Sequence, residues 1–200
     1  MQYEIKHRWT GAVLFTAELG AEYEAKSGGI KLGAAIRLAF RARADLAGAN
    51  LTGANLAGAF LAGADLARAD LADAYLAGAF LARANLAGAN LAHAYLAGAN
   101  LARANLARAY LADAKWRDGV VISQQPIQLY GLHWSVTILD AHMQIGCELH
   151  SLAEWSDFDD ARIVEMDGRD ALRFWREHKD ALLSMARSCG RSFDPVAVGS

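Results

Sequence analysis

A leucine recurs every five residues from Leu46 to Leu111, and an alanine stands two residues before each of these leucines. Such a fixed period is typical of units that cannot bury their apolar face alone and therefore stack on their neighbours. The period excludes an amphipathic helix, because a step of five residues turns each leucine by roughly 140° and spreads the leucines around every face. It also excludes a simple strand, whose side chains alternate with a period of two. The pattern predicts a coil with one short side per pentapeptide, in which alanine and leucine point inward.

The repeated unit reads Ala, then Asp, Asn or an aromatic residue, then Leu-Ala, and then most often Gly or Arg. This unit resembles that of the pentapeptide-repeat family. The resemblance implies a mainly β fold, a right-handed quadrilateral β-helix with four pentapeptides per coil. Residues 44–115 would then form about 3.5 coils, stacked at the strand spacing of roughly 4.8 Å. The core ladder would begin with the leucines Leu46, Leu51, Leu56, Leu61 and Leu66.

If four pentapeptides form one coil, residues twenty apart lie directly above one another. Two aromatic columns then form on the outer surface, with glycines recurring between them. Exposed apolar patches often mark an interface, so these columns predict a partner-binding surface. The alternatives are that the rings only stack on each other or that the C-terminal segment covers them. The candidate partner-binding residues are Phe60, Tyr75, Phe80, Tyr95, Gly58, Gly78 and Gly98, and a candidate secondary face carries Arg83 and Arg103.

The segments on either side of the repeats predict two further parts. Residues 1–43 read as an N-terminal cap, because alternating apolar residues predict a β-hairpin within residues 3–19 and helical spacing predicts an amphipathic helix over residues 30–43. Residues 116–200 read as a C-terminal α+β cap. Its expected strands are Val120–Ile122, Ile127–Tyr130, Trp134–Leu139 and Met143–Leu149, and its expected helices are Ser156–Met166, which Ser156 would cap, and Asp167–Ser188.

Charge and cysteine content limit the class of protein. The net charge is −2, and residues 44–115 hold five basic and five acidic side chains. A neutral repeat region disfavours nucleic-acid binding, which depends on neutralising phosphates. Two cysteines far apart, a polar stretch from Met1 to Arg8 and the absence of a long apolar run predict a cytoplasmic protein that does not enter a membrane.

No pattern in the sequence assembles a catalytic or cofactor site. A zinc site is the sharpest alternative, because His142, Cys147 and His150 lie close together and Cys189 is available elsewhere. If Met143–Leu149 is one strand, however, Cys147 and His150 point to opposite faces. We therefore expect no metal, no cofactor and no catalytic residues.

The sequence is consistent with three functions. The preferred one is a non-catalytic scaffold that presents the outer faces of the repeats to a protein partner, with a homodimer through the C-terminal region as a further possibility. Some members of the pentapeptide-repeat family mimic duplex DNA and bind DNA gyrase or topoisomerase IV, but that mimicry needs an anionic surface, which a neutral repeat region lacks. The third is an enzymatic or zinc-binding activity in the C-terminal region.

Overall fold

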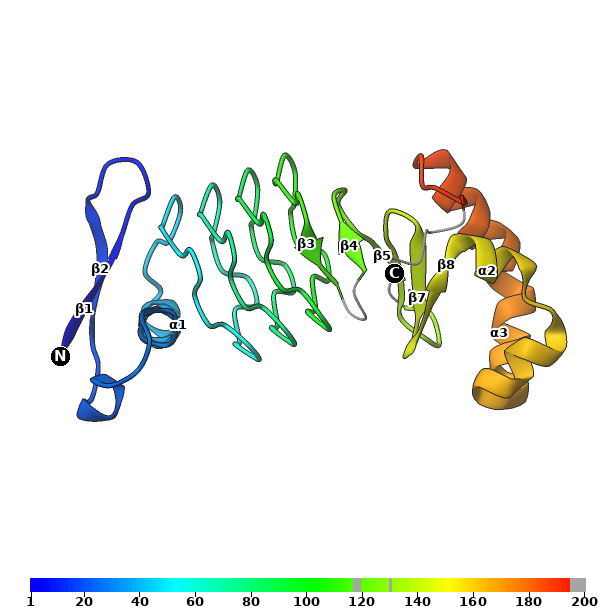
Figure 1. Ribbon diagram of the computed structural model, residues 1–200, viewed down its shortest axis with the longest axis horizontal. Helices are drawn as coiled ribbons and strands as arrows, with labels where there is room; N and C mark the ends of the chain where they lie inside the picture. Colours follow the sequence, from blue (N-terminus) through cyan, green and yellow to red (C-terminus); the bar gives the residue numbers. More distant parts are fainter. Residues whose placement is uncertain (117–119, 130, 195–200) are drawn as a thin grey trace, which may run out of the picture. The chain divides into compact units, whose positions relative to one another are not determined.

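The computed structural model describes residues 1–116, 120–129 and 131–194 (Figure 1). The chain divides into two compact units, Met1–Gln125 and Pro126–Ser200. Within the described residues, the strands form two two-stranded sheets and one four-stranded sheet. None of the described helices combines the length and the apolar composition that spanning a lipid bilayer requires.

The repeats of the first unit wind so that residues twenty apart are neighbours. Parallel bridges join such residues from Asn50 and Asp70 to Tyr95 and Lys115. The Leu51 amide donates to the Asp70 carbonyl at 2.7 Å, and the Asp70 amide donates back to the Ala49 carbonyl at 2.8 Å. Every repeat leucine is buried, as are most of the alanines two residues before them, the exceptions being Ala44, Ala104 and Ala109. The predicted inward ladder and its twenty-residue register are therefore confirmed.

A tight turn follows each leucine of the repeats. The alanine three residues later donates to the leucine carbonyl, as from Ala54 to Leu51 at 3.1 Å. The third residue of each turn has a positive φ, as in type II turns, which explains why glycine is frequent there. This third residue is the turn corner. Seven turn corners nevertheless hold Arg, Asp or His with φ between 55° and 60°: Arg68, Asp73, Arg83, His93, Arg103, Arg108 and Asp113.

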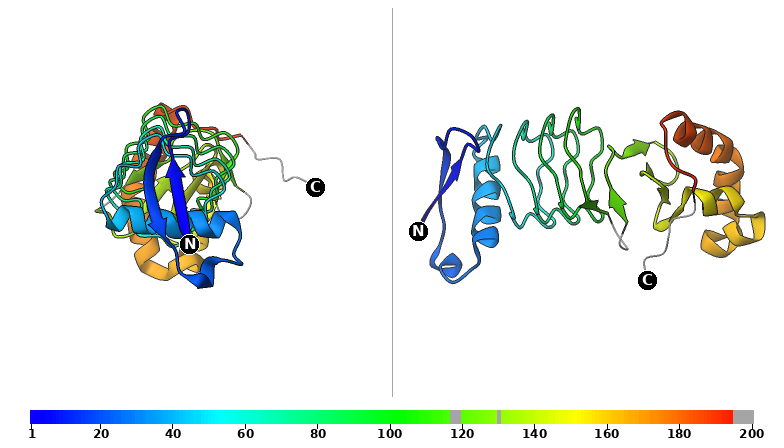
Figure 2. Two further views of the ribbon diagram at one scale, coloured as in Figure 1. Left: turned by 90° about the vertical axis from the view of Figure 1, so that its left-hand side faces the viewer. Right: turned by 45° about the horizontal axis from the view of Figure 1, so that its top comes forward.

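A hairpin and a helix precede the repeats, as predicted. Strands β1 (Gln2–Lys6) and β2 (Val13–Glu18) pair antiparallel, a short 3-10 turn η1 spans Ala21–Tyr23, and helix α1 spans Gly28–Arg41. Figure 2 shows α1 between the hairpin and the first turns of the repeats. The Asn50 amide donates to the Lys6 carbonyl at 2.8 Å, and the Asn55 amide donates to the Gly29 carbonyl at 2.9 Å. Hairpin and helix are thus both hydrogen-bonded to the first repeats.

Helix α1 lies unusually close to the repeat backbone at Gly33. A β-carbon added at Gly33 would lie 1.9 Å from the Asn55 carbonyl oxygen. The absence of a side chain at this position therefore permits the contact. By contrast, a β-carbon added at Gly28, at the start of the same helix, would meet nothing within 4 Å.

The last two residues of the repeats form strand β3 (Ala114–Lys115), which pairs antiparallel with β4 (Val121–Ile122). The second unit contains the antiparallel meander β5 (Ile127–Leu129), β6 (Val136–Ile138), β7 (His142–Ile145) and β8 (Glu148–Ser151). A meander was predicted, but the expectation that Val120–Ile122 is its first strand is wrong, because β4 pairs with β3 in a separate sheet of the first unit. Tyr130, the expected end of one strand, lies outside the described residues. The prediction of a single strand over Met143–Leu149 is wrong. Gly146, with φ of 58°, and Cys147 form a two-residue turn there, and Ile145 pairs with Glu148.

Helices α2 (Leu152–Asp157) and α3 (Asp160–Ser188) complete the second unit. The prediction that Ser156 caps a helix is wrong, because Ser156 lies inside α2. Ser151 caps α2 instead, since its hydroxyl accepts from the Glu154 amide while the Glu154 carboxylate accepts from the Ser151 amide. The predicted boundary at Asp167 corresponds to a break within α3, where Asp167 and Gly168 leave helical geometry. Trp155, Phe174 and Trp175 are buried against the meander.

Candidate functional site

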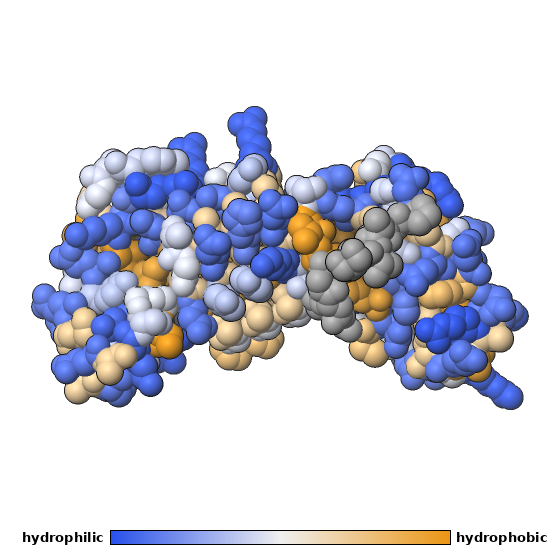
Figure 3. Space-filling view, in the orientation of Figure 1, coloured by the Kyte–Doolittle hydropathy of each residue, from blue (hydrophilic) through white to orange (hydrophobic). Residues whose placement is uncertain are grey.

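Two ring stacks stand on the outside of the repeats. The centroids of Phe60 and Phe80 are 4.6 Å apart and their rings are almost parallel, at 2°. This separation matches the distance between neighbouring strands, so the register of the repeats sets the stack. The residues are 71% and 42% exposed, respectively. On the face shown in Figure 3, both hydrophilic and hydrophobic residues lie over the repeats, so this face is not uniformly polar.

Tyr75 and Tyr95 form the second stack, with centroids 4.5 Å apart and an angle of 7°. Tyr75 is 50% exposed. The Lys115 ammonium donates to the Tyr95 hydroxyl at 2.9 Å and lies 4.6 Å from the ring centroid. The hydrogen bond and charge of Lys115 lower the pKa of Tyr95, and the same hydrogen bond raises the pKa of Lys115. Sequence reasoning did not include Lys115 among the site residues, although its place twenty residues after Tyr95 was a usable signal.

The predicted glycines lie at the turn corners between the tyrosine and phenylalanine columns. Gly58, Gly78 and Gly98 are exposed, and a β-carbon added at any of them would meet nothing within 4 Å. Arg83 and Arg103 are exposed at the next series of corners. Rings, glycines and arginines therefore all lie on the outer surface of the repeats, where a partner could reach them. Their role in binding stays a prediction.

The Asp and Asn columns have a structural explanation. Their side-chain oxygens accept hydrogen bonds from the amide two residues later, as from Ala67 to Asp65 at 3.1 Å. Side chains twenty residues apart are joined as well, because the Asn85 amide donates to the Asp65 carboxylate at 3.1 Å and the Asn90 amide donates to the Asp70 carboxylate at 2.9 Å. Asp70 also pairs with Arg8 at 3.0 Å. These carboxylates are thus engaged by the chain itself.

Three of the residues considered for zinc, His142, Cys147 and His150, belong to the hairpin of β7 and β8, whereas Cys189 is exposed at the C-terminal end of α3. Cys147 is exposed in the turn, and His150 Nε2 lies 3.0 Å from a Glu148 carboxylate oxygen. Burial lowers the pKa of His142. The argument that placed Cys147 and His150 on opposite faces fails, because Cys147 is not in a strand. In the part of the chain that the structure describes, no three His, Cys, Asp or Glu side chains are grouped to hold a metal ion.

Comparisons with known proteins concern the repeats. Residues 44–83 and 84–115 match the family model "Pentapeptide repeats", with 8 copies. No curated protein matches the chain significantly.

Several solved structures share the repeats. A pentapeptide repeat protein from the Arabidopsis thaliana thylakoid lumen is 33% identical with a TM-score of 0.22, and the match covers 34% of this chain and 52% of that one. Rfr23 from the cyanobacterium Cyanothece is 36% identical with a TM-score of 0.20, over 36% of this chain and 42% of that one. The pentapeptide repeat protein alr5209 from Nostoc is 31% identical with a TM-score of 0.19, over 48% of this chain and 88% of that one. The chain thus spans about half of the first relative and less than half of the second.

Proposed function

Because this chain belongs to the pentapeptide-repeat family, we propose that it is a non-catalytic scaffold whose repeats present their outer faces to a protein partner. The observation that carries the proposal is the pair of exposed ring stacks, Phe60 with Phe80 and Tyr75 with Tyr95. Aromatic residues supply much of the energy of protein interfaces. Rings that are already stacked lose little further side-chain freedom when a partner covers them.

We also propose the finer architecture that the family implies. In this proposal residues 44–115 form a right-handed quadrilateral β-helix of about 3.5 coils. The parallel bridges between residues twenty apart support four pentapeptides per coil. Residues 1–43 would cap the first coil, since the hairpin and α1 donate or accept hydrogen bonds at Gly48, Asn50 and Asn55. Residues 116–200 would form the C-terminal cap.

The turn corners give this surface its shape. Gly58, Gly78 and Gly98 place no side chain between the two stacks, so a partner's backbone can approach the repeats there. Arg83 and Arg103, at the neighbouring corners, offer guanidinium groups for carboxylates at the rim of such an interface. A partner with apolar side chains beside acidic ones would complement both features.

The test removes the rings without touching the core. A double variant, Tyr75→Ala with Phe80→Ala, and a control, Tyr110→Ala, are compared with the unchanged protein in affinity capture from host-cell extract. Tyr110 is 61% exposed in a different column, so the control removes a similar ring elsewhere on the surface. We expect one protein to be captured by the unchanged chain and by the control and to be lost with the double variant. Capture by all three proteins would refute the proposed surface.

Circular dichroism of each variant accompanies the capture. If the spectrum of the double variant is unchanged, the loss of the captured protein is due to weaker binding and not to unfolding. Loss of the spectrum instead would mean that the rings are needed for folding, and the surface proposal would fail in that form.

The DNA-mimic alternative gains no support from the carboxylates of the repeats. Asp70 is paired with Arg8, and Asp65 accepts hydrogen bonds from Ala67 and Asn85. A supercoiling assay with DNA gyrase distinguishes the two proposals, since a mimic inhibits the enzyme or protects it from a drug, whereas the scaffold proposed here leaves supercoiling unchanged. A homodimer through the C-terminal region also stays a proposal, and light scattering of the full chain tests it.

A further inference from the structure

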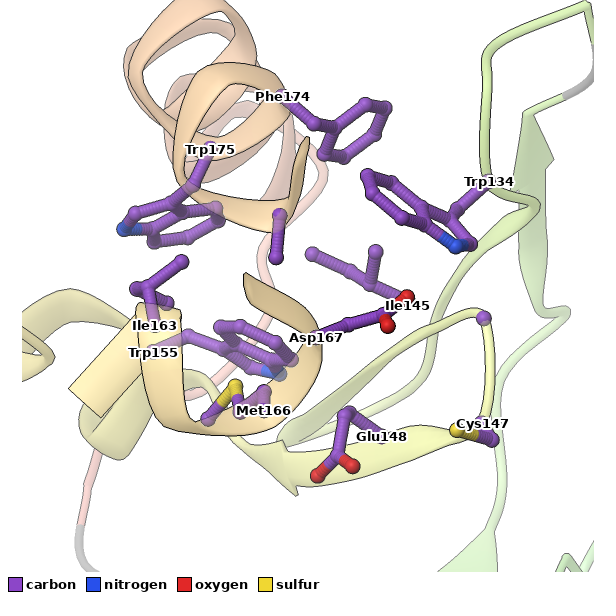
Figure 4. A pocket seen from close by; sticks show the side chains of 12 residues that line it. Trp134, Ile145, Cys147, Glu148, Trp155, Ile163, Met166, Asp167, Phe174 and Trp175 are labelled. Carbon is purple, nitrogen blue, oxygen red and sulfur yellow. The ribbon is translucent and has the colours of Figure 1, made fainter. Parts of the chain in front are cut away.

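The second unit contains a cavity that is independent of the repeat surface. Its volume is about 170 Å³, and it lies between the turn of β7 and β8 and helices α2 and α3 (Figure 4). A cavity of about 150 Å³ is large enough to hold a small organic molecule such as benzene. The aromatic residues that line it are Trp134, Trp155, Phe174 and Trp175.

The rings around the cavity are held in place by contacts with one another and with the backbone. Trp134 and Phe174 meet edge to face with centroids 5.2 Å apart, and Trp155 and Trp175 lie 5.0 Å apart. The Trp155 indole donates to the Met143 carbonyl at 2.6 Å. Trp155, Phe174 and Trp175 are buried, whereas Trp134 lies partly exposed beside the cavity. The cavity is therefore walled by rings that are ordered before any ligand arrives.

A carboxylate accompanies these rings. Asp167 belongs to the break in α3, where its φ of −153° and ψ of 40° depart from helical geometry. Figure 4 shows its side chain extending toward Ile145 and Trp134. Among the described residues, the structure gives this carboxylate no hydrogen bond or ion pair. Glu148 also lines the cavity, but its carboxylate lies 3.0 Å from His150. Asp167 thus places a carboxylate that has no hydrogen bond or ion pair among the described residues beside an aromatic cavity.

We propose that this cavity binds an alkylated ammonium group, such as a quaternary ammonium. Ring faces attract weakly hydrated organic cations, and an adjacent carboxylate adds a favourable charge. A neutral ligand without a hydrogen-bond donor would displace water from Asp167 without replacing its interactions, and an anion would be repelled. Residues 126–200 hold twelve acidic and seven basic side chains, so the field of this unit also favours a cation.

The same unit already places its own cations on aromatic rings. The Lys179 ammonium lies 5.5 Å from the Trp175 ring centroid, and the Arg162 guanidinium lies 5.6 Å from that of Phe158. A metal ion fits the cavity poorly, because the described residues place no group of three suitable ligands there. An organic cation needs only the rings and one carboxylate.

The test compares two probes of the same shape. Choline carries a trimethylammonium group, and 3,3-dimethylbutan-1-ol carries a neutral tert-butyl group in its place. Each is titrated into the full chain while the indole NMR signals of Trp134, Trp155 and Trp175 are followed. We expect saturable shifts with choline and an affinity about tenfold higher than for the alcohol, a ratio that corresponds to about 1.4 kcal/mol. Equal affinities, tighter binding of the alcohol or no saturable shift with choline would overturn the proposal.

Two variants assign the effect to the carboxylate. Asp167→Asn keeps the shape of the side chain and removes its charge, so choline affinity should fall about fivefold while that for the alcohol stays the same. Asp170→Asn is the matched control, because Asp170 lies on the same helix, is exposed and pairs with Arg173 at 2.9 Å. An equal loss in both variants would assign the effect to the general field of the unit and overturn the assignment to Asp167. Asp167 is exposed, and an unchanged unfolding midpoint confirms that its variant is folded.

Discussion

Replacing Gly33 with alanine should destabilise the protein, even though alanine is the better helix former. In the interior of a helix such as α1, this exchange normally stabilises by about 1 kcal/mol. At Gly33, however, the new β-carbon would lie 1.9 Å from the Asn55 carbonyl oxygen and 2.8 Å from its carbon. Both are backbone atoms and cannot rotate away. Helix α1 or the first turn of the repeats would therefore have to move.

The size of the loss follows from the contact distances. A carbon and a carbonyl oxygen approach to about 3.3 Å, so the 1.9 Å contact requires a displacement of about 1.4 Å. Such overpacking costs about 1 to 3 kcal/mol. The same displacement stretches the 2.9 Å hydrogen bond from the Asn55 amide to the Gly29 carbonyl, which contributes about 1 kcal/mol. After the helix-propensity gain is subtracted, we expect a net loss of about 1 to 3 kcal/mol.

Urea unfolding followed by circular dichroism measures this loss. Gly28→Ala is the control, because a β-carbon there meets nothing within 4 Å and the variant should be unchanged or slightly more stable. The two glycines lie in the same helix, so the difference between them isolates the contact with Asn55. If Gly33→Ala were as stable as Gly28→Ala, the close packing of α1 on the repeats would be refuted.

Three further predictions follow from single contacts. Leu76→Ala should lower the free energy of unfolding, measured in urea, by about 4 kcal/mol, because the neighbouring alanines and leucines are held by the repeat backbone and cannot fill the cavity. Leu76→Met, which nearly conserves the volume, should lower it by less than about 1.5 kcal/mol. Lys115→Met should raise the pKa of Tyr95, which Lys115 holds below the ordinary value of 10.0, and a spectrophotometric titration that shows no change would exclude this contact in solution. Hydrogen bonds from Ser151 lower the pKa of Glu154 below its ordinary 4.5, so its contribution to stability is complete above that pH and is lost as the pH falls. Glu154→Gln should therefore flatten the acid side of the stability profile, and an unchanged profile would contradict this reasoning.

The repeats could be predicted well because two periods coincide in them. The five-residue period identifies the buried leucines, and the twenty-residue recurrence of Tyr75 with Tyr95 and of Phe60 with Phe80 identifies the stacks. Each contact in this part joins residues at a constant separation along the chain. The packing of the repeats therefore follows from these two periods, whereas the bond from Lys115 to Tyr95 and the ion pair of Arg8 with Asp70 were not predicted.

The second unit was harder to predict because its local signals compete. The run from Met143 to Leu149 is rich in apolar residues and resembles one strand, yet Gly146 introduces a turn in the middle of it. Ser156 is a suitable helix cap in isolation, but Ser151 with Glu154 forms the complete capping box and begins the helix earlier. Strand pairing selected the turn at Gly146, and the local capping box selected the helix start at Ser151.

The cavity of the second unit could not be predicted at all. It brings Trp134 from the meander together with Phe174 and Trp175 from α3, at separations that follow no period. The sequence placed Phe174 and Trp175 only within the expected helix Asp167–Ser188, and Trp134 only within the expected strand Trp134–Leu139. A site made by unrelated segments becomes visible only after they fold together.

The turn corners of the repeats tolerate substitution, whereas the buried leucines do not. A corner such as Gly78 has open space around it, whereas the leucine two residues earlier has none. Corners with φ near 60° already accept Arg, Asp and His at a strain of about 1 kcal/mol each. The residues at the turn corners can therefore be substituted one at a time, and each substitution can add a charge or a contact. The buried leucines and the coil that they form stay the same. A lineage could exchange one binding partner for another in this way without inventing a new fold.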